Sequence, residues 1–90
     1  MFLDSPLSIK ATEIFKQHTE YFDEEAKNKY PNAFDFDALE YSSSVEDSRK
    51  LNFYKGPCVI VAGNGMCTAG RITHHLKHGL WDRKNTLLFV

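Results

Sequence analysis

A short glycine-containing turn is the feature of this sequence that could most directly do chemistry. Residues 63–65, Gly-Asn-Gly, follow the apolar run 58–62 and precede a helix-forming segment. Glycine and asparagine tolerate positive φ angles, so such a turn can expose backbone N–H groups. Exposed N–H groups beside the positive end of a helix dipole favour an anion, phosphate in particular. The turn therefore predicts an anion site, with Thr68 capping the helix and Arg71 one turn inside it.

The turn matches neither of the two best-known phosphate-binding motifs. It lacks the Gly-Lys-Ser/Thr ending of a P-loop, and no third glycine follows at the spacing of the dinucleotide fingerprint. A single arginine such as Arg71 is more often solvated or ion-paired than bound to a ligand. From the motif alone, a phosphate contact and a purely structural turn are both open.

Histidines are the second group that could do chemistry. His74 and His78 are spaced i, i+4, which can place two imidazoles on one metal ion. Neither Cys58 nor Cys67 falls where it could supply a third ligand, so we expect no metal site in this chain. No serine–histidine–acid arrangement has a recognisable setting either, and we predict no catalytic residue.

The periodicity of the helix expected from 68 to 79 predicts which of its sides faces water. Ile72, Leu76 and Leu80 mark the expected core side. The opposite side would then be a short basic strip facing solvent, which could touch a nucleic-acid backbone without binding it tightly. The residues of this strip are Arg71, His74, Lys77 and His78.

The segments that must position these residues alternate between strands and helices. We expect strands at 1–4, 39–43, 58–62 and 86–90. We expect helices from Pro6 to about Phe22, within 23–29 up to a stop at Pro31, from 45 to about 53, and from 68 to 79. Alternation with short links favours a parallel sheet with right-handed crossovers. The prediction is one α/β domain over residues 1–90, with about four parallel strands and helices on both faces, a Rossmann-like three-layer arrangement.

Local signals support several of these elements. Ser5 and Pro6 form an N-cap and first helical residue, and Ser44 with Asp47 forms a capping box. We expect Phe34 and Phe36 to anchor their loop to the core by packing. One face of the first helix should be buried. Its residues are Leu7, Ala11, Ile14, Phe15, His18 and Phe22.

Composition narrows the class of protein. The net charge of −1 provides no global basic field for nucleic acid, so any anion site must be local. No apolar run approaches the roughly 18 residues of a membrane span, and no signal-peptide pattern opens the chain. Two cysteines form no disulfide framework, and we expect reduced thiols and a cytoplasmic protein. Because the chain begins and ends within strand-like runs, we expect a segment of a longer protein.

Beyond these patterns, the sequence resembles the β-CASP region of metallo-β-lactamase-fold ribonucleases. The similarity rests on LDSPLSIKATEIF, YFDEEA and SVEDSRKLN, and above all on the stretch from Gly56 to Val90 with its Gly-Met turn, GRITHHLK and NTLLFV. Where relatives usually carry a hydroxyl residue before this turn, the chain has Gly63, which leaves backbone rather than side-chain contacts there.

The resemblance implies a fold, a partner and a role. It implies a β-CASP portion that helps to hold single-stranded RNA against a metallo-β-lactamase domain of the same parent protein. The two zinc ions of that family are bound mainly by the other domain, and the β-CASP motif histidines lie beyond Val90. The implied RNA- or phosphate-binding residues are Ser5, Asn64, Gly65, Met66, Thr68 and Arg71.

Three hypotheses follow. The first is a β-CASP segment of a zinc-dependent RNA-processing ribonuclease that is catalytically silent alone, because metal-activated water needs ligands that this chain lacks. The second is a stand-alone module that binds nucleotides or phosphate through the same turn. The third is a scaffold without any ligand of its own.

Overall fold

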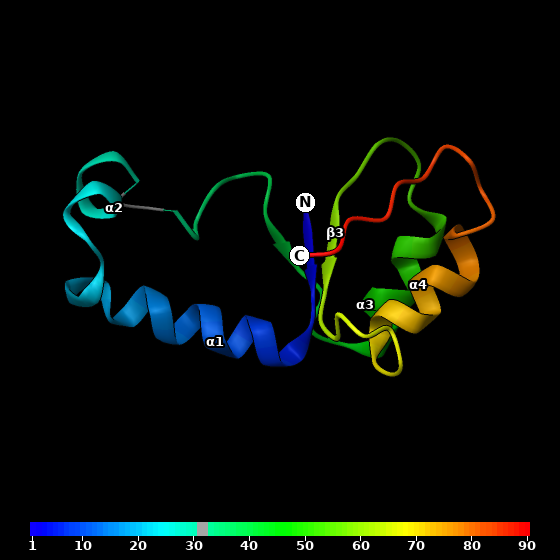
Figure 1. The fold of residues 1–90 in the computed structure, drawn as a ribbon, viewed down its shortest axis with the longest axis horizontal. Coiled ribbons are helices and arrows are strands. Elements are labelled where there is room, and N and C mark those ends of the chain that lie inside the picture. The colour runs from blue at the N-terminus through cyan, green and yellow to red at the C-terminus, as the bar shows by residue number, and fades with distance from the viewer. Residues whose placement is uncertain (31–32) are drawn as a thin grey trace.

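A three-stranded parallel sheet lies at the centre of the computed structural model, which describes residues 1–30 and 33–90 (Figure 1). The strands are β1 (Phe2–Asp4), β2 (Glu40–Tyr41) and β3 (Ile60–Ala62), in the order β2-β1-β3. Phe2 pairs with Glu40 on one side and with Ile60 on the other. Because all three strands are parallel, their carboxyl ends share one edge of the sheet. The predicted α/β class with a small parallel sheet is confirmed.

The expected fourth strand is wrong. Residues 86–90 form no ladder with β3, although β3 is an edge strand, and all five side chains are exposed. A strand at a sheet edge is fixed by hydrogen bonds to one neighbour only. With so little apolar surface buried, nothing offsets the conformational entropy lost in ordering the segment.

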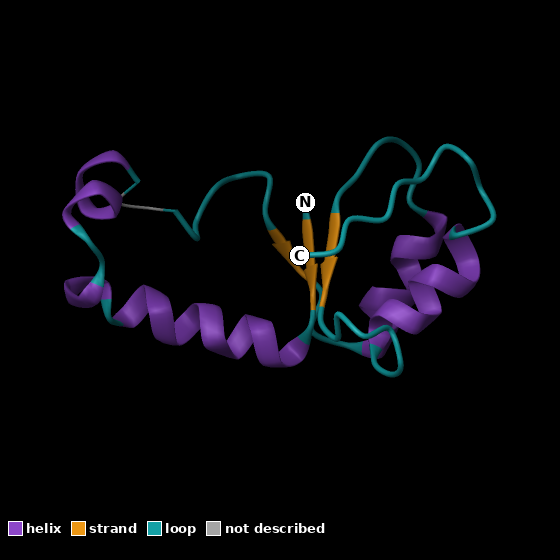
Figure 2. Ribbon diagram, in the orientation of Figure 1, coloured by secondary structure: helices purple, strands orange, loops and turns teal. Residues whose placement is uncertain are grey.

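Helices extend to both sides of the sheet (Figure 2). On one side, α1 (Pro6–Gln17) runs outward from the end of β1, and α2 (Glu24–Lys29) lies at its far end. On the other side, α3 (Val45–Lys50) and α4 (Arg71–Gly79) lie together. One-turn 3₁₀ helices occupy Thr19–Tyr21 and Leu51–Phe53. The expected stop of α2 at Pro31 lies outside the described residues.

The first helix starts as predicted but does not bury the predicted face. Ser5 caps it by accepting a hydrogen bond from the N–H of Ser8, and Pro6 is its first residue. Leu7 is 78% exposed, and the only buried residue of the helix is Ile9. The helix leaves a sheet of only three short strands, so most of its apolar side reaches no partner among the described residues.

Aromatic packing holds the loop before β2 against the end of α1. The ring of Phe34 lies 6.0 Å from that of Phe15 and 6.0 Å from that of Phe22. Phe34 therefore anchors its loop to the end of α1 rather than to the buried core as predicted, and Phe36 stays 43% exposed.

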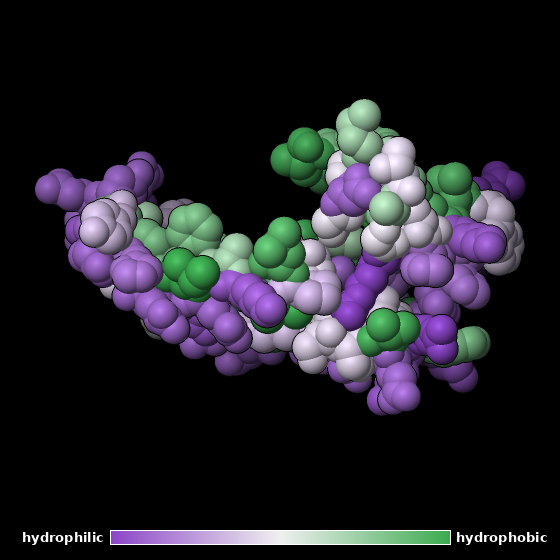
Figure 3. Space-filling view, turned by 90° about the horizontal axis from the view of Figure 1, so that it is seen from below, coloured by the Kyte–Doolittle hydropathy of each residue, from purple (hydrophilic) through white to green (hydrophobic). Residues whose placement is uncertain are grey.

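The buried interior is small and partly polar. Among the described residues, the buried hydrophobic side chains are Phe2 and Ile9, and the buried polar residues are Asp4, Ser42 and Ser48. Hydrophobic side chains also show on the surface among hydrophilic ones (Figure 3). None of the helices in the described parts of the chain has the length and apolar character needed to cross a membrane.

Candidate anion-binding turn

The turn after β3 uses left-handed backbone at three positions. Asn64 has φ 72°, Cys67 has φ 56° and Gly70 has φ 78°. Asn64 tolerates this conformation better than most residues with a side chain, and Gly70 has no Cβ to clash. The predicted tight turn is confirmed: Asn64 takes positive φ as expected, whereas Gly63 and Gly65 do not.

The Asn64 side chain holds the turn closed. Its amide nitrogen donates to the carbonyl of Ala69 at 3.0 Å and to the hydroxyl of Thr68 at 3.4 Å. The backbone carbonyl of Asn64 also accepts from the N–H of Cys67 at 3.0 Å. The side chain of Asn64 therefore shapes the turn from within, which limits what it can offer to a ligand.

The outer part of the turn is open to solvent. The Met66 side chain is 83% exposed, and a Cβ placed on Gly65 would meet no heavy atom within 4 Å. Among the described residues, nothing accepts a hydrogen bond from the backbone N–H groups of Gly65, Met66 and Thr68. Exposed backbone N–H groups without an acceptor in the protein are available to bind anionic oxygens.

Ser5 lies beside the start of this turn. A Cβ built on Gly63 would come within 3.1 Å of the Ser5 hydroxyl oxygen. The two residues follow β1 and β3, which are neighbours in the sheet. The structure therefore brings Ser5 and the turn together, although they are far apart in the sequence.

The start of the following helix differs from the prediction. We expected Thr68 as the N-cap, but α4 begins at Arg71 with Gly70 as its N-cap and no side-chain capping bond. Gly70 has φ 78° and ψ −171°, a conformation that delays helix entry and suits glycine alone. Thr68 instead accepts a hydrogen bond from Asn64.

The most buried charged group lies immediately before Ser5. Asp4 ends β1 with its side chain fully buried, and α3 and α4 supply its partners. One guanidinium nitrogen of Arg71 donates to Oδ1 at 2.6 Å. Nε2 of His75 and the hydroxyl of Ser48 approach Oδ2 at 2.5 Å and 2.6 Å. This cluster ties both helices to the central strand.

The environment of Asp4 controls its ionisation. Burial alone would raise its pKa, but hydrogen bonds from Ser48, His75 and Arg71 favour the carboxylate and hold the pKa below its ordinary value. Asp4 is therefore a buried, ionised carboxylate with cationic and hydroxyl partners.

Arg71 is placed differently from our expectation. It is the first helical residue, not one turn inside, and its side chain is 15% exposed rather than facing solvent. Its guanidinium also donates to the carbonyls of Ser42 and Ser43 at 2.5 Å and 2.9 Å. Since these contacts occupy the cation, Arg71 contributes to the turn by fixing the start of α4.

The Asp4 cluster is the part of the site that we did not predict. The sequence pattern placed Arg71 in the basic strip that faces solvent, away from any buried partner. The i, i+4 spacing of Arg71 and His75 was the available signal, because these residues share a helix face. An aspartate closing a buried strand needs hydrogen-bond donors, and that face could supply them.

The described residues do not fit a zinc site. No group of three His, Cys, Asp or Glu side chains in residues 1–30 and 33–90 is placed to share a metal ion. Asp4 and His75 are in contact, but the Arg71 cation occupies the other carboxylate oxygen. A metal would have to displace a buried positive charge there, which argues against coordination at that cluster.

The chain resembles known proteins along its full length. The model of the Beta-Casp domain family matches residues 1–90. Ribonuclease TTHA0252 of Thermus thermophilus is 41% identical over 93 residues, which cover all of this chain and 22% of that protein. Transcription termination factor FttA of Methanocaldococcus jannaschii is 34% identical over 85 residues, which cover 90% of this chain and 13% of that factor.

A second archaeal relative extends the comparison. Transcription termination factor FttA of a Lokiarchaeum species is 34% identical over 94 residues, which cover all of this chain and 14% of that factor. The chain thus spans about a fifth of the length of these curated relatives, or less. The resemblance stated from the sequence is confirmed: this chain belongs to the Beta-Casp domain family.

Proposed function

We propose that this chain is the RNA-backbone-binding β-CASP portion of a longer RNA-processing ribonuclease. The observation that carries the proposal is the exposed turn 63–70 in a chain that the Beta-Casp family matches throughout. One relative is named as a ribonuclease and others as transcription termination factors, which supports RNA as the ligand.

The turn suits an RNA backbone better than a base. Its free donors include the backbone N–H groups of Gly65, Met66 and Thr68, and backbone groups present no side-chain pattern that could read a base edge. Phosphate contacts of this kind position a strand without selecting its sequence. Ser5 adds a hydroxyl next to the turn, while Asn64 and Arg71 hold its shape.

The rest of the proposal concerns the parent protein. Zinc-dependent hydrolysis would take place in a metallo-β-lactamase domain of the same protein, which would hold the two zinc ions, and the protein would act in the cytoplasm. The chain itself would supply binding and positioning only. It would therefore bind single-stranded RNA without cutting it.

Two measurements on the 90-residue chain test this proposal. The first incubates the chain with zinc and a labelled single-stranded RNA, and we expect no cleavage above a buffer control. The second follows the amide resonances of the chain by NMR during titration with oligouridylate or with a mononucleotide. We expect salt-sensitive RNA binding with the largest shifts in residues 64–70.

Other outcomes would overturn parts of the proposal. An RNA-cleaving activity that co-purifies with the chain and survives removal of contaminating nucleases would contradict the proposal that the chain alone is catalytically silent. Saturable mononucleotide binding at the same turn, without RNA binding, would favour a stand-alone nucleotide module. No shift with either ligand would indicate a scaffold.

A further inference from the structure

We propose a second phosphate-binding site in the hollow between α3 and α4, which takes a phosphodiester of the same RNA strand. The hollow has a volume of about 370 Å³. Eight side chains with hydrogen-bond donors line it, and four of these are already bonded within the protein: Ser48, Arg71, Thr73 and His75. We call the space lined by the other four the basic hollow: Arg49, Asn52, His74 and His78. The identity of the ligand as RNA rests on the proposed function, whereas the affinity for phosphate rests on the hollow itself.

The charge balance of the hollow favours an anion. No carboxylate is among its lining residues. The nearby Asp4 is fully buried and already bound by Arg71, His75 and Ser48. Within the described residues, Arg49 has no ion-pair partner, so its positive charge is not neutralised by the protein. A concave site with uncompensated positive charge attracts anions.

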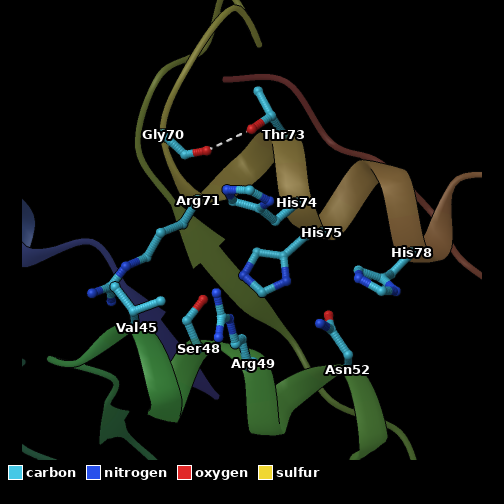
Figure 4. A pocket seen from close by; sticks show the side chains of 10 residues that line it. All are labelled: Val45, Ser48, Arg49, Asn52, Gly70, Arg71, Thr73, His74, His75 and His78. Carbon is cyan, nitrogen blue, oxygen red and sulfur yellow. Dashed lines mark hydrogen bonds between the residues drawn. The ribbon is translucent and has the colours of Figure 1, made fainter.

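The donors face a common space. Figure 4 shows Asn52 and His78 on opposite sides of the hollow, with Arg49 next to Asn52 and His74 further along α4. No side-chain hydrogen bond within the described residues occupies Arg49, Asn52 or His78. The guanidinium fork, the amide NH₂ and the imidazole N–H can all donate to phosphate oxygens, and arginine does so with two parallel bonds.

The position of the hollow connects it to the turn. Gly70 ends the turn, serves as the N-cap of α4, and also lines the hollow together with Thr73. A strand whose phosphate lies on residues 64–68 can therefore continue past the start of α4 and place a later phosphate in the hollow. Of the basic strip expected from the sequence, His74 and His78 line the hollow with their donors free, Arg71 lines it but is bound to Asp4, and Lys77 does not line it.

A matched pair of arginine variants tests the proposal. Arg49→Gln removes the uncompensated charge of the hollow, and Arg83→Gln removes an exposed charge in the connection after α4, outside the hollow. Fluorescence anisotropy with a labelled oligouridylate at several salt concentrations measures the RNA affinity of both variants. We expect Arg49→Gln to weaken binding about three- to tenfold and to reduce the salt slope by about 0.7, the value for one phosphate on a single strand. Arg83→Gln should match the wild type.

Folding is checked by thermal melting, followed by circular dichroism. If Arg49→Gln melts like the wild type and binds RNA equally well, the second site is wrong. Cross-linking of the wild-type chain to 4-thiouridine RNA gives an independent answer that needs no variant. We expect cross-linked peptides that contain Asn52 or residues 74–78, and cross-links confined to the turn would also overturn the site.

Competition with inorganic phosphate distinguishes the two possible ligands of the hollow, a phosphodiester of RNA and free phosphate. We expect free phosphate to compete weakly and the oligonucleotide to bind far more tightly, because the strand also contacts the turn. Equal affinity for both would mean a free-anion pocket and would overturn the RNA assignment. If the wild-type chain binds RNA through the turn but not through the hollow, only this inference is wrong. If the wild-type chain binds no RNA at all, the proposed function is wrong as well.

Discussion

The guanidinium of Arg71 lies 2.6 Å from the carboxylate of Asp4, a residue 67 positions earlier in the chain. Asp4 ends the central strand, and Arg71 begins the helix that follows the turn. This ion pair therefore fixes the start of α4 to the carboxyl edge of the sheet, and the exposed turn lies between these two anchored points. The contacts explain why a chain with so small an apolar core holds the turn in one place.

Removal of Arg71 should destabilise the chain strongly. Arg71→Met leaves the fully buried Asp4 carboxylate without its cation, and breaking a buried pair in this way costs about 3 kcal/mol or more. Urea denaturation followed by circular dichroism measures the change. Arg83→Met is the matched control, because an exposed arginine without such contacts should change stability by less than about 0.5 kcal/mol. Equal stabilities of the two variants would show that the ion pair does not support the fold.

Acid should weaken the fold through Asp4. An unfolded aspartate titrates near 3.8, and hydrogen bonds from Ser48, His75 and Arg71 outweigh burial and hold the folded pKa below this value. The stabilisation is therefore complete above the unfolded pKa and is lost as the pH falls from there through the folded pKa.

The chemical shift of the Asp4 carboxyl carbon, followed by NMR during titration, reports this pKa directly. Ser48→Ala removes one hydrogen bond to the carboxylate, so its Asp4 should titrate at a higher pH than in the wild type. An Asp4 that titrates above 3.8 in the folded wild type would contradict the assignment.

Substitutions at Asn64 separate backbone conformation from hydrogen bonding. Asn64→Ala removes the bonds to Thr68 and Ala69 and forces alanine to φ 72°, which costs about 1–2 kcal/mol in backbone strain alone. Asn64→Gly removes the same bonds without that strain. We expect the melting temperatures to fall in the order wild type, Asn64→Gly, Asn64→Ala. RNA affinity should fall in the same order, and an alanine variant as stable as the glycine variant would exclude the left-handed conformation.

Local signals predicted local structure well. Ser5 and Pro6 start α1 as expected, and Ser44 and Asp47 form the predicted capping box with both reciprocal bonds. The strand, turn and helix around residues 58–79 also follow from the apolar run and its glycines. These features depend on neighbours within a few residues, which a sequence displays directly.

Features that depend on distant partners were harder to predict. The apolar stripe of α1 has helical spacing, yet Leu7 is exposed because spacing does not say whether a partner surface exists. Residues 86–90 have strand composition but no ladder. Arg71 looked like a surface residue because its partner, Asp4, lies at the other end of the sequence. Such pairings arise from topology, which one sequence does not specify.

The RNA affinity of Gly65→Leu is the most direct test of the exposed turn as the RNA-backbone contact. Gly65 does not have positive φ, and a Cβ there meets no atom within 4 Å, so leucine should leave the fold and melting temperature unchanged. Its side chain would cover the neighbouring backbone N–H groups, and we predict RNA binding at least about tenfold weaker, the loss of one charge-assisted contact or more. A stable Gly65→Leu chain that binds oligouridylate as tightly as the wild type would contradict the account.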